Sequence, residues 1–120
     1  MLLIFGAIIG ALSVAIGAFG AHVLEPRLAQ DDFATFQTAV RYQMYHSLLL
    51  MIVGLWYRNS PDQRLFNIGL VILGGILLFS GSLYLIVFTG IQSFGAVAPL
   101  GGMLLIIGWA SLAWIAYSTK

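Results

Sequence analysis

LLIFGAIIGALSVAIGAFGAHV, residues 2–23, is a long apolar stretch in which the first ionisable side chain is His22. At about 1.5 Å per residue, a helix over these residues is roughly 33 Å long, enough to cross a hydrocarbon core about 30 Å thick. A cleaved signal peptide normally has a charged start and a shorter apolar run, so we interpret this stretch as a retained transmembrane helix. Pro26 follows it closely and is expected to end the helix.

The composition of the whole chain agrees with a lipid environment. Hydrophobic residues make up 61% of the 120 residues and charged residues only 8%, and the mean hydropathy is +1.01, so a soluble domain is excluded. A net charge of +1 without a run of like charges offers no surface for nucleic acid. The absence of Cys excludes disulfides and thiolate chemistry. We predict a single membrane domain over residues 1–120.

Four apolar stretches separated by polar segments predict the fold class. The expected transmembrane spans are residues 2–23, 41–57, 65–88 and 97–117. Before the second span, apolar residues such as Phe33 and Phe36 recur at helical spacing, and Asp31 or Asp32 is expected to cap the helix. This predicts a short amphipathic helix over residues 31–40 at the membrane interface. The chain is therefore expected to be an all-α integral membrane protein, a four-transmembrane-helix bundle with an interfacial helix before the second span.

Charged and aromatic residues near the predicted span ends give an orientation. Arg58, Arg64, Lys120 and the amino terminus lie on one side, whereas Arg27 and Arg41 lie on the other side among acidic residues. Cytoplasmic loops carry the excess of Lys and Arg, so the first side is expected to be cytoplasmic, with both termini there. The expected location is the cell (inner) membrane. Aromatic residues near the span ends are expected at the interface, among them Trp56, Tyr57, Trp109, Trp114 and Tyr117.

Small residues recur along the first span at steps of four and three, which places them on one helix face. They are Gly6, Gly10, Ser13, Gly17 and Gly20. Lipid does not drive helices together, so close helix contacts depend on such residues. Two interpretations stay open at this point: packing inside the bundle, and a seam between copies of the chain in a homo-oligomer.

Few polar side chains fall within the spans, and most of them cluster near one end of the predicted first hairpin. The candidate network or ligand-binding residues are His22, Arg41, Tyr42, Gln43 and His46, with Ser82 of the third span as a possible partner. A polar group at membrane depth is costly unless it is paired, so His46 in particular is expected to have a partner. The alternatives are Tyr42, the region of His22 and a hydroxyl of the third span such as Ser82. A hydrogen-bond network, a ligand or lipid-headgroup site, and a haem or metal site remain open, because neutral imidazole is both a base and a ligand.

Templates for catalysis are not met. The predicted spans hold no Asp or Glu at membrane depth, and no phosphate-binding Gly loop or Ser nucleophile motif is recognised. We expect no catalytic residues, no metal site, no cofactor and no enzyme activity. The expected partners are membrane lipid and either a second copy of the chain or a larger membrane complex, without nucleic acid.

Several short segments, taken together, resemble the YgdD/YwdK-type family of small inner-membrane proteins. They are GAFGAH at 17–22, YQMYH at 42–46, GSLY at 81–84, TG at 89–90, PLGG at 99–102 and GW at 108–109. The resemblance covers nearly the whole chain and implies four membrane helices and an unknown function. It also implies that His22, Gln43 and His46 belong to a shared feature.

Three functional hypotheses follow. The leading one is a non-enzymatic accessory or membrane-stabilising component that packs through its Gly-rich helix faces. The second is a small ligand, lipid or ion carrier with an external-face His/Gln/Tyr site. The third is a protein that ligates a haem or metal through His22 and His46.

Overall fold

The computed structural model describes residues 1–118, and within them the protein is all-helical, as predicted. The elements are α1 (Leu2–Phe19), extended by a π-helical turn (Gly20–Leu24), then α2 (Gln30–Asn59), α3 (Gln63–Thr89), a 3-10 turn (Gln92–Ala96) and α4 (Ala98–Ser118). Lys120, which entered the orientation argument, lies outside the described residues.

Three helical segments are long and apolar enough to cross a membrane. They are Leu2–Leu24, Gln63–Thr89 and Gln92–Ser118, with mean hydropathies of 2.5, 2.4 and 1.8. The expected second span does not reach this level, because polar side chains between Arg41 and Ser47 interrupt its apolar sequence.

The residues expected to form a short interfacial helix are instead the first part of α2. This helix begins at Gln30 and runs unbroken to Asn59, so residues 31–40 are not an element of their own. The side chains of Phe36 and Ala39 are 1% and 0% exposed, because they pack against other helices. Asp31 and Asp32 lie in the first turn of α2, where their negative charges interact favourably with the helix dipole. Ala29 occupies the N-cap position that was expected for one of them.

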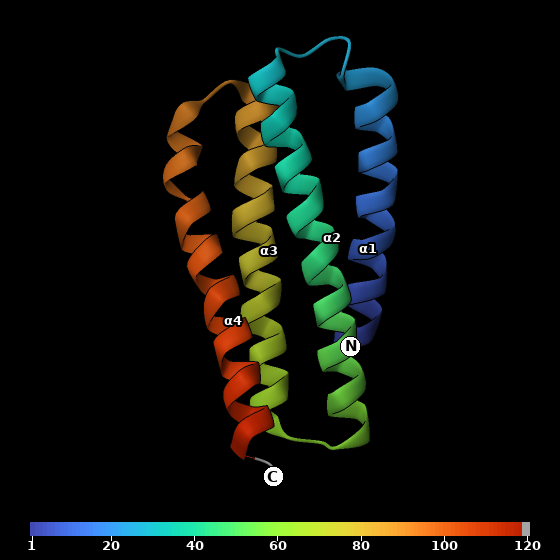
Figure 1. The fold of residues 1–120 in the computed structure, drawn as a ribbon, viewed down its shortest axis with the longest axis vertical. Coiled ribbons are helices and arrows are strands. Elements are labelled where there is room, and N and C mark those ends of the chain that lie inside the picture. The colour runs from blue at the N-terminus through green and yellow to red at the C-terminus, as the bar shows by residue number, and fades with distance from the viewer. Residues whose placement is uncertain (119–120) are drawn as a thin grey trace.

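The four helices stand side by side in chain order (Figure 1). Each packs mainly on its neighbours in sequence, so α1 lies against α2 and α4 lies against α3. The bundle is therefore flattened, with extents of 50 × 26 × 19 Å. The start of α1 and the last described turn of α4 lie toward the end of the bundle where the α2–α3 turn is found (Figure 1).

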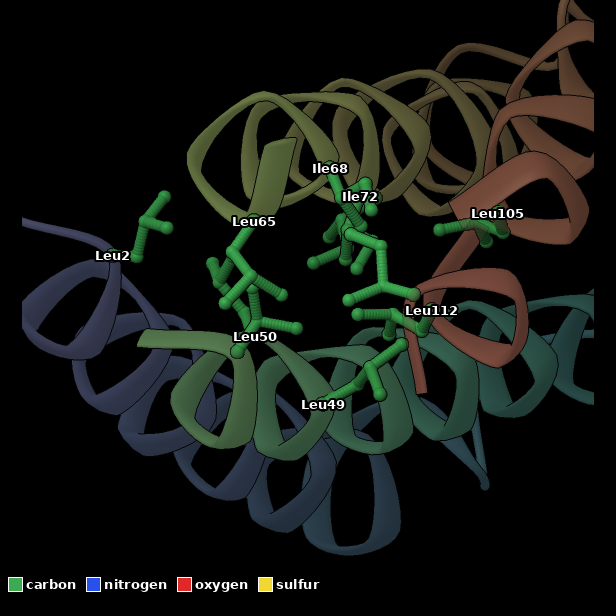
Figure 2. Close-up of a cluster of buried hydrophobic side chains, with 11 residues drawn as sticks. Leu2, Leu49, Leu50, Leu65, Ile68, Ile72, Leu105 and Leu112 are labelled. Carbon is green, nitrogen blue, oxygen red and sulfur yellow. The ribbon is translucent and has the colours of Figure 1, made fainter. Parts of the chain in front are cut away.

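A cluster of aliphatic side chains from all four helices fills the half of the bundle nearest this turn. Leu50 of α2, Leu65 and Ile72 of α3, and Leu112 of α4 lie together between the helices, and Leu2 of α1 belongs to the same cluster at its edge (Figure 2). Burying apolar surface gains little in lipid, so the contribution of this cluster is close packing between helices.

Asp62 caps α3 at the same end of the bundle. Its carboxylate accepts hydrogen bonds from the backbone N–H of Arg64 at 2.8 Å and from the guanidinium of Arg64 at 2.8 Å. These donors stabilise the ionised carboxylate, so the pKa of Asp62 lies below its ordinary value. The cap explains why α3 begins directly after the turn at residues 60–62.

The small-residue row of α1 packs on α2. A Cβ atom at Gly6 would come within 2.9 Å of the backbone of Met51 and Ser47, and one at Gly20 would overlap the ring of Phe36. Gly10 and Gly17 face α2 in the same way, and Ser13 between them is 1% exposed. The row is thus occupied by a contact within the chain. These residues are therefore not available for a contact between two copies of the chain.

Candidate functional site

Gln43 joins three helices at the centre of the bundle. Its Nε2 atom donates to the backbone carbonyl of Ile9 on α1 at 3.1 Å, and its Oε1 atom accepts from the hydroxyl of Tyr84 on α3 at 2.7 Å. The Gln43 side chain is buried, with 6% exposed. A primary amide in an apolar interior must have both its ends paired, and here one side chain achieves this by linking α1, α2 and α3.

His46 joins α2 to α4. Its Nδ1 atom lies 2.7 Å from the backbone carbonyl of Tyr42. We assign the ring hydrogen to Nδ1, because a carbonyl can only accept. The other nitrogen, Nε2, then accepts from the indole N–H of Trp109 at 3.2 Å. Both ring nitrogens of a neutral imidazole are therefore satisfied, although His46 is only 5% exposed.

A serine hydroxyl provides the fourth hydrogen bond between helices. Ser80 Oγ on α3 donates to the backbone carbonyl of Ala39 on α2 at 2.8 Å. Ser82, one of the alternatives considered as a partner of His46, instead donates to the carbonyl of Phe79 in its own helix at 2.9 Å. The prediction for Ser82 is wrong because residues two apart on a helix point in nearly opposite directions.

The structure does not bring His22 and His46 together. His22 is exposed on the π-helical turn, two residues after Gly20, which packs on Phe36. His46 is next to Ser47, whose hydroxyl packs on Gly10. The levels of Gly20 and Gly10 differ by roughly 15 Å along α1. The expectation of one cluster of both histidines at the end of the hairpin is therefore wrong, because α2 extends well beyond the end of its apolar part.

The other two candidate residues lie on the surface of α2. Arg41 is exposed and has no hydrogen bond or ion pair to the described residues. The ring of Tyr42 packs on Phe79, with centroids 4.6 Å apart, and stacks on His46 at 5.9 Å. Tyr42 and His46 line a cleft of about 500 Å³ between α2 and α4, together with Tyr45, Phe79 and Trp109.

This geometry limits the chemistry of the site. Residues 1–118 contain no group of three or more His, Cys, Asp or Glu side chains placed to hold a metal ion. The lone pair of His46 Nε2 already accepts the hydrogen of Trp109, so ligation would require breaking that bond. In the described arrangement, therefore, no pair of free histidine side chains is available to ligate a haem or a metal ion.

Four partners in these bonds were not singled out from the sequence as site residues. They are the carbonyl of Ile9 and the side chains of Ser80, Tyr84 and Trp109. Trp109 was expected at the membrane interface, yet its indole N–H points to a buried imidazole. The hydroxyls of Ser80 and Tyr84 in an otherwise apolar span were a usable signal, since such groups need partners in lipid.

The two serines of α3 offer a matched comparison. Ser80→Ala is expected to lower the free energy of unfolding by about 0.5–1 kcal/mol, because it removes a hydrogen bond between helices. Ser82→Ala removes only a bond within α3 and is expected to change stability by less than about 0.3 kcal/mol. Thermal unfolding in detergent, followed by circular dichroism, measures both. Equal losses would contradict the assignment of Ser80 as a bridge.

Comparisons with known proteins place these residues within a family. Residues 16–102, which include Gln43, His46, Ser80 and Tyr84, match the family DUF423, described as proteins of unknown function. The UPF0382 membrane protein YwdK of Bacillus subtilis strain 168 is 43% identical over 108 residues, covering 89% of this chain and 88% of its own. A UPF0382 membrane protein of Staphylococcus haemolyticus is 40% identical over 112 residues, covering 93% of this chain and 91% of its own. No solved structure matches the chain.

Proposed function

The chain belongs to the DUF423 family of proteins of unknown function, and from this premise we propose that it is a non-enzymatic, four-span protein of the cell (inner) membrane that serves as an accessory or membrane-stabilising component. In this proposal α2 is the fourth span. It lies in the row between α1 and α3, which are both apolar enough to cross a membrane. Four crossings put both termini on one side, which the loop charges assign to the cytoplasm.

This proposal is supported by the hydrogen bonds that the buried polar groups form between helices. Gln43, His46 and Ser80 each bond to another helix. A proton-coupled transporter or an enzyme needs a titratable or nucleophilic group that is open to its substrate. In this bundle the amide of Gln43 and the imidazole of His46 instead form hydrogen bonds between helices, as expected of a protein whose role is packing in the membrane.

One observation favours a second candidate, a carrier of a small apolar ligand or lipid. The cleft of about 500 Å³ beside His46 is large enough for part of such a molecule, and its walls are mainly aromatic and aliphatic. Native mass spectrometry of the purified protein separates the two candidates. A bare chain or oligomer supports the packing role, whereas a retained small molecule that is lost in Tyr45→Ala favours the carrier.

The four-span topology is tested by cysteine labelling, because the chain has no Cys of its own. Single replacements at the exposed positions Ala29, Ser60 and Ser93 place a thiol in each connection. In intact cells a membrane-impermeant maleimide is expected to label Ala29→Cys and Ser93→Cys fully and Ser60→Cys only after permeabilisation. Equal labelling of Ala29→Cys and Ser60→Cys in intact cells would show that α2 does not cross the membrane.

A further inference from the structure

Arg41 is a cation without a counter-ion in residues 1–118. Within these residues, the ion pair joins Asp62 to Arg64, which lie at the other end of the bundle from Arg41. The acidic residue Asp32 lies on the same helix as Arg41 but more than two turns earlier, a rise of roughly 13 Å. The exposed guanidinium of Arg41 is therefore free to pair with a group from outside the described residues.

The depth of Arg41 favours such a pairing. Arg41 lines a pocket with Gly17 of α1 and Ala21 of the π-helical turn, which both lie inside the apolar stretch Leu2–Leu24. Two residues before it, the carbonyl of Ala39 bonds to Ser80, well inside α3. On both sides, then, apolar helices continue past the level of Arg41. An unpaired charge at this depth costs several kcal/mol unless it reaches a counter-charge at the interface.

The pocket beside Arg41 has the features of a headgroup site. It has a volume of about 180 Å³, and the small residues Gly17 and Ala21 leave room on the α1 side. Gln37 lies one turn before Arg41 on the same face of α2 and provides a second hydrogen-bond donor. Phe33 forms an apolar wall, and its ring stacks on that of Phe36 at 6.3 Å. Among the described residues, no acidic side chain lines the pocket.

We propose that this pocket binds the phosphate of an anionic phospholipid, such as phosphatidylglycerol. The guanidinium of Arg41 supplies the charge, the amide of Gln37 donates a second hydrogen bond, and an acyl chain lies along the groove between α1 and α2. A lipid with an additional ammonium group fits less well, because no carboxylate lines the pocket to receive it. This inference stands on Arg41 and its surroundings and is independent of the proposed packing role.

Native mass spectrometry of the full-length protein in detergent, titrated with phosphatidylglycerol, tests the proposal. Arg41→Gln keeps a polar side chain of similar reach but removes the charge, and it is expected to weaken the lipid adduct at least about fivefold. Arg41→Lys keeps the charge and is expected to retain most of the binding. Arg27→Gln removes an exposed cation at the same end of the bundle and serves as the matched control, with binding as in the wild type.

The remaining outcomes also decide the question. Equal adducts in Arg41→Gln and wild type, with unchanged helix content by circular dichroism, overturn the site. Equal affinity for phosphatidylethanolamine, with the same dependence on Arg41, overturns the preference for an anionic headgroup. Displacement of the lipid by millimolar inorganic phosphate would overturn the lipid as occupant in favour of a free anion.

Discussion

Gly101→Ala is expected to be among the most damaging small substitutions in this protein, with a loss of about 3 kcal/mol in the free energy of unfolding. The α-carbon of Gly101 packs directly on the main chain of α3, and a Cβ atom there would overlap the backbone of Leu78 and Phe79. A backbone in a helix cannot rotate away as a side chain can, so α4 must move outward along its length. The separation also weakens the bond from Trp109 to His46, because Trp109 is carried by α4. Thermal unfolding in detergent measures the effect.

The adjacent glycine provides the control. A Cβ atom at Gly102 would meet the ring of Phe79 at 3.6 Å, which is an ordinary contact. Gly102→Ala makes the same chemical change in the same turn of α4, so any effect of helix propensity is matched. It is expected to change stability by less than about 0.5 kcal/mol. Similar losses in both variants would mean that α3 and α4 are not held as closely as the structure describes.

Much of the fold follows from the pattern of hydropathy alone. The expected spans 65–88 and 97–117 agree closely with α3 (Gln63–Thr89) and α4 (Ala98–Ser118). The spacing of small residues also indicates which face of α1 makes a close contact. It does not indicate the partner of that face, because a second helix of the same chain and a helix of another copy present the same chemistry.

The continuity of α2 was harder to predict. The polar residues between Gln30 and Arg41 resemble an interfacial helix, and hydropathy places the second span after them. Because no Pro or Gly interrupts this segment, the helix runs through, and Phe36 packs on Tyr84 and Phe88 of α3 with ring centroids 5.7 and 6.1 Å apart. Tertiary packing thus decides whether such a segment lies flat or continues the span.

The candidate site was predicted only in part. Gln43 and His46 were expected to need partners, and both have them. The partners themselves depend on the rotation of each helix and on the register between helices. These decide that Ser80 rather than Ser82 faces α2, and that Trp109 rather than His22 reaches His46. Neither quantity can be read from the spacing of residues within one helix.

Gln43→Leu is expected to cost about 2 kcal/mol of unfolding free energy, the largest loss from any single polar side chain of the bundle. The change keeps a similar volume but removes the two bonds that link α2 to Ile9 and to Tyr84. The cost arises mainly because the partly buried hydroxyl of Tyr84 loses its acceptor in an apolar surrounding. The carbonyl of Ile9 is less affected, since it belongs to a helix and can still accept within α1. Unfolding monitored in detergent measures the loss.

A double-mutant cycle with Tyr84→Phe shows whether the cost comes from this bond. Tyr84→Phe alone leaves one amide oxygen unpaired and is expected to cost about 1 kcal/mol. In the double variant, Gln43→Leu with Tyr84→Phe, neither residue retains an unpaired polar group, so the combined loss is expected to be smaller than the sum of the two single losses by about 1 kcal/mol. Strictly additive losses would mean that Gln43 and Tyr84 stabilise the bundle independently. The hydrogen bond between them would then contribute nothing to holding α2 and α3 together.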